Sequence, residues 1–123
     1  MKLHLSRPEG LNQITSCGSG FVAVNGVRHA RSLLVTPQRL VEDWPAASFE
    51  ALTSASLGTA LALEPEVVLL GTGERLQFPA ADILRPLIEA GIGYEVMDTG
   101  AACRTYNILM AEGRRVLAAL IIA

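Results

Sequence analysis

From residue 66 onward, short apolar runs alternate with longer segments of helical periodicity. Three runs have the length of buried strands: "VVLL" at 67–70, "GYEVM" at 93–97 and "RRVLAALII" at 114–122. Because parallel strands need a crossover connection, this order predicts a β-α-β-α-β unit with helices on the faces of a parallel sheet. The last run is continuously apolar after its two arginines, so we expect it at or near the centre of the sheet.

The two connecting segments carry helix signals. "PAADILRPLIEAG" at 79–91 ends at Gly91, a favoured residue after a helix, and its apolar side consists of Ile83, Leu84, Leu87 and Ile88. Pro86 either kinks this helix or moves its regular part to about Arg85, because an interior proline costs roughly 3 kcal/mol. The second helix is predicted to be capped by Asp98 or Thr99, to end at Gly113 and to bury Ala102, Tyr106, Leu109 and Met110.

The first third of the chain predicts antiparallel strands. Asn25-Gly26 between apolar residues is a strong hairpin signal, since both residues tolerate positive φ. We therefore expect 21–24 to pair with 27–35, with Thr36-Pro37 ending the second strand. Further along, Trp44-Pro45 marks a loop, Thr53 or Ser54 starts a helix, and Glu64-Pro65 stops it. The whole pattern is an α/β domain with an antiparallel N-terminal part and a parallel C-terminal part.

Composition limits the classes of protein to which the chain can belong. Its 123 residues suit a single domain spanning 1–123. A net charge of −2 without any Lys/Arg block argues against nucleic acid as a partner. No apolar run approaches the roughly 20 residues of a transmembrane segment. Because "MKLHLSRPEG" lacks signal-peptide and presequence character, we expect a cytoplasmic protein.

Two glycine-containing turns are candidate ligand sites. Gly71-Thr72-Gly73 and Asp98-Thr99-Gly100 each follow a predicted parallel strand, so they should lie side by side at one end of the sheet. Free N–H groups, the positive end of a helix dipole and the Thr72 and Thr99 hydroxyls would suit a small anion or carboxylate. The alternative is a pair of tight corners, with Asp98 already occupying the helix N–H groups as a cap.

The helix after the second turn carries three more candidate ligand residues, Cys103, Arg104 and Asn107. The helix dipole and Arg104 would favour the thiolate of Cys103, whereas a buried structural thiol is the alternative. Cys17 and Cys103 are expected to be free thiols, because they belong to different elements and the compartment is reducing. His4 and His29 have no companion ligands in the sequence, so neither a metal nor a cofactor is expected.

These motifs as a set resemble the Mth938-like family. The resemblance covers about residues 10–121 and is carried by Trp44-Pro45, "VVLLGTG", "GIGYEVMDTGAACRTYNILMAEGRRVLAAL" and the Glu112-Gly113-Arg114 within it. It implies a three-layer α/β fold with a mixed sheet and no established enzymatic reaction. Relatives in this family include a mitochondrial assembly factor for respiratory complex I.

Three functions remain open from the sequence. The first is a non-enzymatic binding or assembly module with a protein partner. The second is a small-ligand or anion-binding protein, or an enzyme, that uses the pocket between the two glycine turns, with Cys103 or Asp98 as the reactive group. The third is self-association through an exposed strand.

Overall fold

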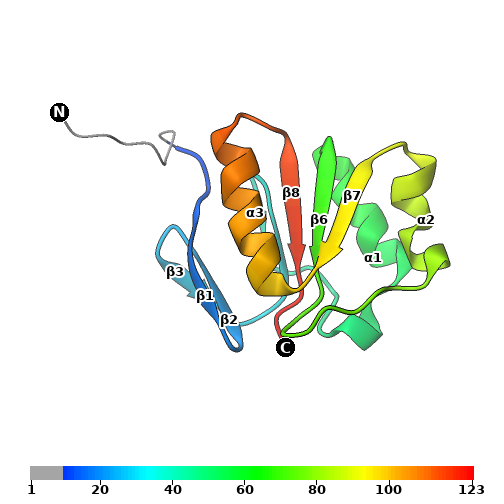
Figure 1. The fold of residues 1–123 in the computed structure, drawn as a ribbon, viewed down its shortest axis with the longest axis horizontal. Coiled ribbons are helices and arrows are strands. Elements are labelled where there is room, and N and C mark those ends of the chain that lie inside the picture. The colour runs from blue at the N-terminus through cyan, green and yellow to red at the C-terminus, as the bar shows by residue number, and fades with distance from the viewer. Residues whose placement is uncertain (1–9) are drawn as a thin grey trace.

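The fold places one five-stranded sheet between two outer layers. The computed structural model describes residues 10–123, and the sequence's His4 lies outside them. The strands are β1 Ile14–Gly18, β2 Phe21–Val24, β3 Val27–His29, β4 Leu33–Val35, β5 Leu40–Val41, β6 Val67–Gly71, β7 Gly93–Met97 and β8 Val116–Leu120. The helices are α1 Ser54–Gly58, α2 Ala81–Glu89 and α3 Thr99–Ala111, with 3₁₀ segments at Phe49–Ala51 and Thr59–Leu63. Figure 1 shows α3 and the strands β1 to β3 on one side of the large sheet and α1 and α2 on the other.

The large sheet has the order β5-β4-β8-β6-β7. Strands β6, β7 and β8 run parallel, and β4 joins β8 antiparallel. The apolar last strand, β8, therefore lies at the centre as predicted, and its five residues are all buried. These findings confirm the three-layer α/β fold, with its parallel C-terminal unit and antiparallel N-terminal part.

Alternate residues of the central strands supply two cores. On β8, Val116, Ala118 and Leu120 face the core under α3 and the small sheet. Leu117 and Ala119 face the opposite core, under α1 and α2, as the two-residue period of a strand requires. Trp44 closes that second core at 4% exposure, and its indole Nε1 donates to the carbonyl of Ser56 at 2.8 Å.

The predicted hairpin forms, but its second strand is shorter than expected. Asn25 and Gly26 have φ values of 51° and 85°, and β2 pairs with β3 across them. The chain then breaks at 30–32, and β4 leaves for the large sheet. The prediction of one strand over 27–35 was therefore wrong, because residues 33–35 gain two buried faces beside β8.

Two helix predictions need correction. Helix α2 accommodates Pro86 inside a helix that begins at Ala81, so the regular part does not start near Arg85. Ile88 is 53% exposed, since only a narrow stripe of α2 containing Leu84 and Leu87 faces the sheet. In α3 the buried face is shifted to include Cys103, and Leu109 is only partly buried.

None of the helices in residues 10–123 has the length and the continuous apolar character that crossing a bilayer requires.

Candidate functional site

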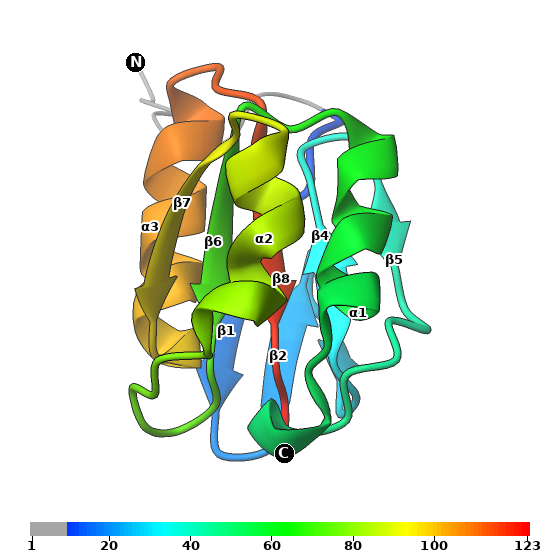
Figure 2. The same cartoon turned by 90° about the vertical axis from the view of Figure 1, so that its right-hand side faces the viewer.

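The two glycine turns meet at one end of the sheet, as the sequence predicted. Strands β6 and β7 are direct parallel neighbours, with Gly71 opposite Met97. The turns are joined by two backbone hydrogen bonds: Thr72 N donates to the Met97 carbonyl and Thr99 N donates to the Gly73 carbonyl, each at 2.9 Å. Figure 2 shows the chain leaving both strands at the same edge.

The Thr72 side chain is used inside its own turn. Its hydroxyl donates to the carbonyl of Arg75 at 2.7 Å and accepts from the N–H of Gln77 at 3.1 Å. Thr72 is also only 1% exposed. This hydroxyl therefore folds the loop after β6 back on itself.

The Thr99 side chain is used in a second set of internal bonds. Its hydroxyl accepts from Gly73 N at 2.9 Å and donates to the carbonyl of Ile121 at 2.8 Å. Asp98 is the cap of α3, because its Oδ1 accepts from Ala101 N at 2.8 Å. Several of the donors that an anion would need are thus already paired within the turns.

Gly71 allows α3 to start directly against β6. A Cβ atom at Gly71 would lie 2.9 Å from Thr99 Cα, 3.0 Å from Thr99 Oγ1 and 3.2 Å from Ala102 Cβ. The first distance is shorter than real Cβ contacts and the other two are unusually tight, so a side chain at this position would push the first turn of α3 away. Gly71 therefore has a packing role and does not line the pocket described next.

A pocket of about 360 Å³ opens beside these turns. Its walls are the β1–β2 turn, the turn after β6, the first turn of α3 and the residues after β8; the lining residues are Cys17, Gly18, Ser19, Gly20, Phe21, Gly73, Glu74, Asp98, Thr99, Gly100, Arg104, Ile121, Ile122 and Ala123. Ser19 Oγ donates to Glu74 Oε2 at 2.6 Å and so links two of the walls. Four of the eight predicted ligand residues line this pocket: Gly73, Asp98, Thr99 and Arg104.

The contribution of the β1–β2 turn was missed from the sequence. In the sequence, Gly18-Ser19-Gly20 indicates only a break between two β-rich runs. Its position beside Glu74 depends on how the small sheet packs on α3, and such a long-range contact leaves no local signal.

Arg104 is the cationic group of the pocket. Its side chain is exposed, and it makes no ion pair within residues 10–123. Two carboxylates, those of Asp98 and Glu74, line the same pocket. The pocket is therefore mixed in charge, and a ligand with several negative charges would be repelled.

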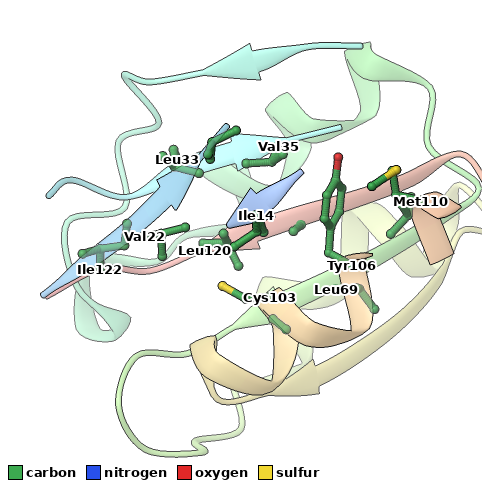
Figure 3. Packing of buried hydrophobic residues seen from close by; sticks show 14 residues of the cluster. Ile14, Val22, Leu33, Val35, Leu69, Cys103, Tyr106, Met110, Leu120 and Ile122 are labelled. Atoms are coloured by element: carbon green, nitrogen blue, oxygen red, sulfur yellow. The ribbon is translucent and has the colours of Figure 1, made fainter. Parts of the chain in front are cut away.

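Cys103 is a buried thiol, so the structural alternative given for this residue holds. It is 3% exposed and belongs to the core under α3 (Figure 3). Burial is the main cause that raises its pKa, and the neighbouring Cys17 raises it further, whereas Arg104 lowers it by a smaller amount. Desolvation therefore outweighs the effects that were expected to favour the thiolate.

Asn107 holds the small sheet against α3 and lies away from the pocket. Its Nδ2 donates to the carbonyl of Ile14 at 2.7 Å, and its Oδ1 accepts from Ile14 N at 2.9 Å. On the same helix, the buried Tyr106 hydroxyl donates to the carbonyl of Asn12 at 2.8 Å. Burial raises the pKa of Tyr106. These bonds replace the ladder bonds that an edge strand lacks.

His29 lies in β3, and its Nδ1 is 3.5 Å from Glu42 Oε1. Over residues 10–123 there is no group of three or more His, Cys, Asp or Glu side chains placed to hold a metal ion. Both cysteines are free thiols.

Comparison with known proteins shows the family. A family model described as "Protein of unknown function (DUF498/DUF598)" matches residues 14–121. The chain is 41% identical over 104 residues to "NADH dehydrogenase (ubiquinone) 1 alpha subcomplex assembly factor 3" of Bos taurus, covering 83% of this chain and 55% of that protein. This chain thus spans little more than half the length of that relative.

Solved structures agree with the family match. A crystal structure of a Bordetella parapertussis protein is 43% identical, with a TM-score of 0.87 over 95% of this chain and 100% of that one. A solution structure of a Bordetella pertussis protein, described as an Mth938-like domain, is 38% identical, with a TM-score of 0.84 over 99% of this chain and 92% of that one. The chain therefore belongs to the DUF498/DUF598 family and has the Mth938-like fold that its sequence predicted.

Proposed function

We propose that this chain is a protein-binding module that assists the assembly of a multisubunit respiratory enzyme and carries out no chemical step itself. The observation that supports the proposal is the 41% identity to the bovine assembly factor over 104 residues. That similarity spans 83% of this chain, so it extends over most of the fold. A cytoplasmic location is part of the proposal, and cell fractionation would test it.

The loop between β6 and α2 offers the surface on which we expect the partner to bind. Leu76 is 50% exposed and Phe78 is 74% exposed, although both are large and apolar. The loop starts beside the end of β7, which is an edge strand of the large sheet (Figure 2). An exposed aromatic side chain beside the unpaired backbone groups of an edge strand suits the binding of a protein.

A pull-down from the source cells tests this proposal. We expect tagged protein to recover subunits of an NADH dehydrogenase after mild crosslinking, and deletion of its gene to lower the amount of the assembled enzyme. Phe78→Ser should reduce recovery by at least tenfold. Ile108→Ser is the matched control, because Ile108 is also apolar and 59% exposed but lies on α3.

Two results would contradict the proposal. Unchanged levels of assembled NADH dehydrogenase in the deletion strain would remove the assembly role. Equal recovery by the Phe78 and Ile108 variants would show that the loop is not the binding surface.

A second candidate function is the binding of a small ligand in the pocket at the turns. The observation that favours it is the Arg104 guanidinium beside the first turn of α3, which makes no ion pair with any of residues 10–123. Because Asp98 and Glu74 also line the pocket, we expect a ligand with one carboxylate rather than a polyanion.

Isothermal titration with acetate and with inorganic phosphate tests this second function. We expect acetate to bind more tightly than phosphate, and Arg104→Ala to weaken binding of acetate by about tenfold, as the loss of one charge-assisted hydrogen bond implies. Arg85→Ala removes the same charge from α2 and serves as the control. Equal affinity in both variants, or no heat at millimolar ligand, would rule the site out.

A further inference from the structure

The two cysteines lie next to each other although they are far apart in the sequence. Cys17 in β1 is directly opposite Val22 in β2, and directly opposed residues point to the same face of a sheet. Val22 is fully buried in the core under α3, and Cys17 packs against that core. Figure 3 shows the Cys103 side chain leaving α3 on the side of Val22. Their positions in different elements therefore do not separate the two thiols, although both are free in this structure.

The two thiols differ in how far they are buried and in whether they line the pocket. Cys17 is partly buried and is among the residues that line the pocket, whereas Cys103 does not line it. Cys103 is buried beneath it, and its pKa is raised by burial and by the adjacent Cys17. Cys103 is the neighbouring thiol that can attack a mixed disulfide on Cys17, and its raised pKa makes this second attack the slower step.

We infer that Cys17 and Cys103 are a reversible disulfide site that is oxidised by low-molecular-weight disulfides entering the pocket. The Cys17 thiolate attacks one sulfur of the reagent and breaks its S–S bond. Cys17 then carries a mixed disulfide, and the first small thiol leaves with the proton that Cys17 lost. Cys103 next loses its proton and attacks the sulfur of Cys17, which forms the protein disulfide and releases the second small thiol.

A disulfide between Cys17 and Cys103 would tie one wall of the pocket, the β1–β2 turn, to α3. Cys17 immediately precedes the β1–β2 turn, whose residue Ser19 bonds to Glu74 across the pocket. Joining Cys17 to α3 would fix this turn against the helix that carries Arg104. Closing a long loop of the chain would also stabilise the oxidised protein against unfolding.

Oxidised glutathione is the probe that tests the inference. The reduced full-length protein is incubated with an excess of it, quenched with acid and weighed by intact-mass spectrometry. We expect a monomer whose mass is lower by two hydrogens and that holds no glutathione, and a peptide map that joins Cys17 to Cys103. Its urea unfolding midpoint should be higher than that of the reduced protein.

Two variants separate the roles of the sulfurs. Cys103→Ala should accumulate one glutathione on Cys17, because no resolving thiol is present. Cys17→Ser should leave Cys103 unmodified while the protein is folded and allow its modification in urea. The circular dichroism spectrum of each variant confirms its fold before the reaction.

Several results would overturn the inference. A native protein that keeps glutathione on Cys17 would show that Cys103 cannot resolve the mixed disulfide. Modification of folded Cys17→Ser at Cys103 would show that the buried thiol is reached without Cys17. Disulfide-linked dimers in place of the internal bond would assign Cys17 to contacts between copies.

Discussion

Replacement of Gly71 by alanine tests how closely α3 packs on β6. The new Cβ would meet the backbone of Thr99 at 2.9 Å, a neighbour that is not the end of a flexible side chain. The start of α3 must therefore move by several tenths of an ångström. Thr99 also accepts from Gly73 and donates to Ile121 through its hydroxyl, so the movement lengthens both hydrogen bonds.

The expected cost can be assembled from three contributions. Overpacking of a well-packed site costs roughly 1–3 kcal/mol. Weakening two hydrogen bonds adds at most about 1 kcal/mol. The unfolded chain loses entropy when glycine becomes alanine, which offsets roughly 0.4–1 kcal/mol. We expect Gly71→Ala to lower the free energy of unfolding by about 1.5–2.5 kcal/mol.

Urea denaturation followed by Trp44 fluorescence measures this change. Trp44 is 4% exposed and is the only tryptophan, so its emission reports loss of the core. With a slope of about 1–1.5 kcal/mol per molar urea for a chain of this size, the midpoint should fall by about 1–2.5 M. Circular dichroism must give the same midpoint for the two-state treatment to hold.

Gly58→Ala is the matched control, because it makes the same chemical change in the opposite setting. Gly58 has helical angles, φ −60° and ψ −31°, and a Cβ there would meet no atom within 4 Å. Its midpoint should rise, since alanine in a helix is favoured by roughly 0.5–1 kcal/mol. A Gly71→Ala midpoint equal to or above that of the unsubstituted protein would refute the close approach of α3.

Three further substitutions test other parts of the structure. Gly26→Val should cost about 1–2 kcal/mol in thermal or urea unfolding, because a β-branched residue is strained at a φ of 85°, and an unchanged midpoint would mean that the turn is absent. Asn107→Ala leaves both backbone groups of Ile14 without their side-chain partner and should lower the free energy of unfolding by about 1–3 kcal/mol, measured in the same way. Hydrogen exchange at β1 should accelerate in this variant, and unaltered exchange would show that Asn107 does not hold β1 against α3. The pKa of Glu66 is lowered chiefly by the N–H of Arg115, so the charged carboxylate stabilises the fold, and this contribution is lost as the pH falls below 4.5. Glu66→Gln should therefore be less stable than the unsubstituted protein at neutral pH, with a difference that shrinks in acid. A difference that does not change with pH would show that the Glu66 charge does not stabilise the fold.

Most of the fold follows from local patterns in the sequence. The runs at 67–70, 93–97 and 114–122 each carry their own strand signal, and Asn25-Gly26 carries a hairpin signal within two adjacent residues. The sequence could not predict that residues 27–35 form two strands, β3 and β4, because this depends on Leu33–Val35 pairing with β8, more than eighty positions away. In the structure Ser32 lies at this break, where it is buried and its hydroxyl accepts from Ile122 N.

Only the part of the candidate site that follows from the parallel direction of the strands could be predicted. Parallel strands put their carboxyl ends at one edge, so the meeting of the two glycine turns could be deduced. The packing of β1 on α3 could not be deduced from the sequence. This packing brings Cys17 to Cys103 and Ser19 to Glu74. Short-range patterns do not encode such contacts between separate layers.

The internal hydrogen bonding of the turns changes which residues can carry function. Thr72 and Thr99 use their hydroxyls within the fold, and Gly73 N is paired with Thr99. A ligand in the pocket must therefore be recognised mainly by side chains, of which Arg104 is the cationic one. Replacing Gly73 would not test this, since its φ of 105° makes any side chain strained whether or not a ligand binds. Substitution of Arg104 changes the charge of the pocket without altering any turn, so it separates binding from folding.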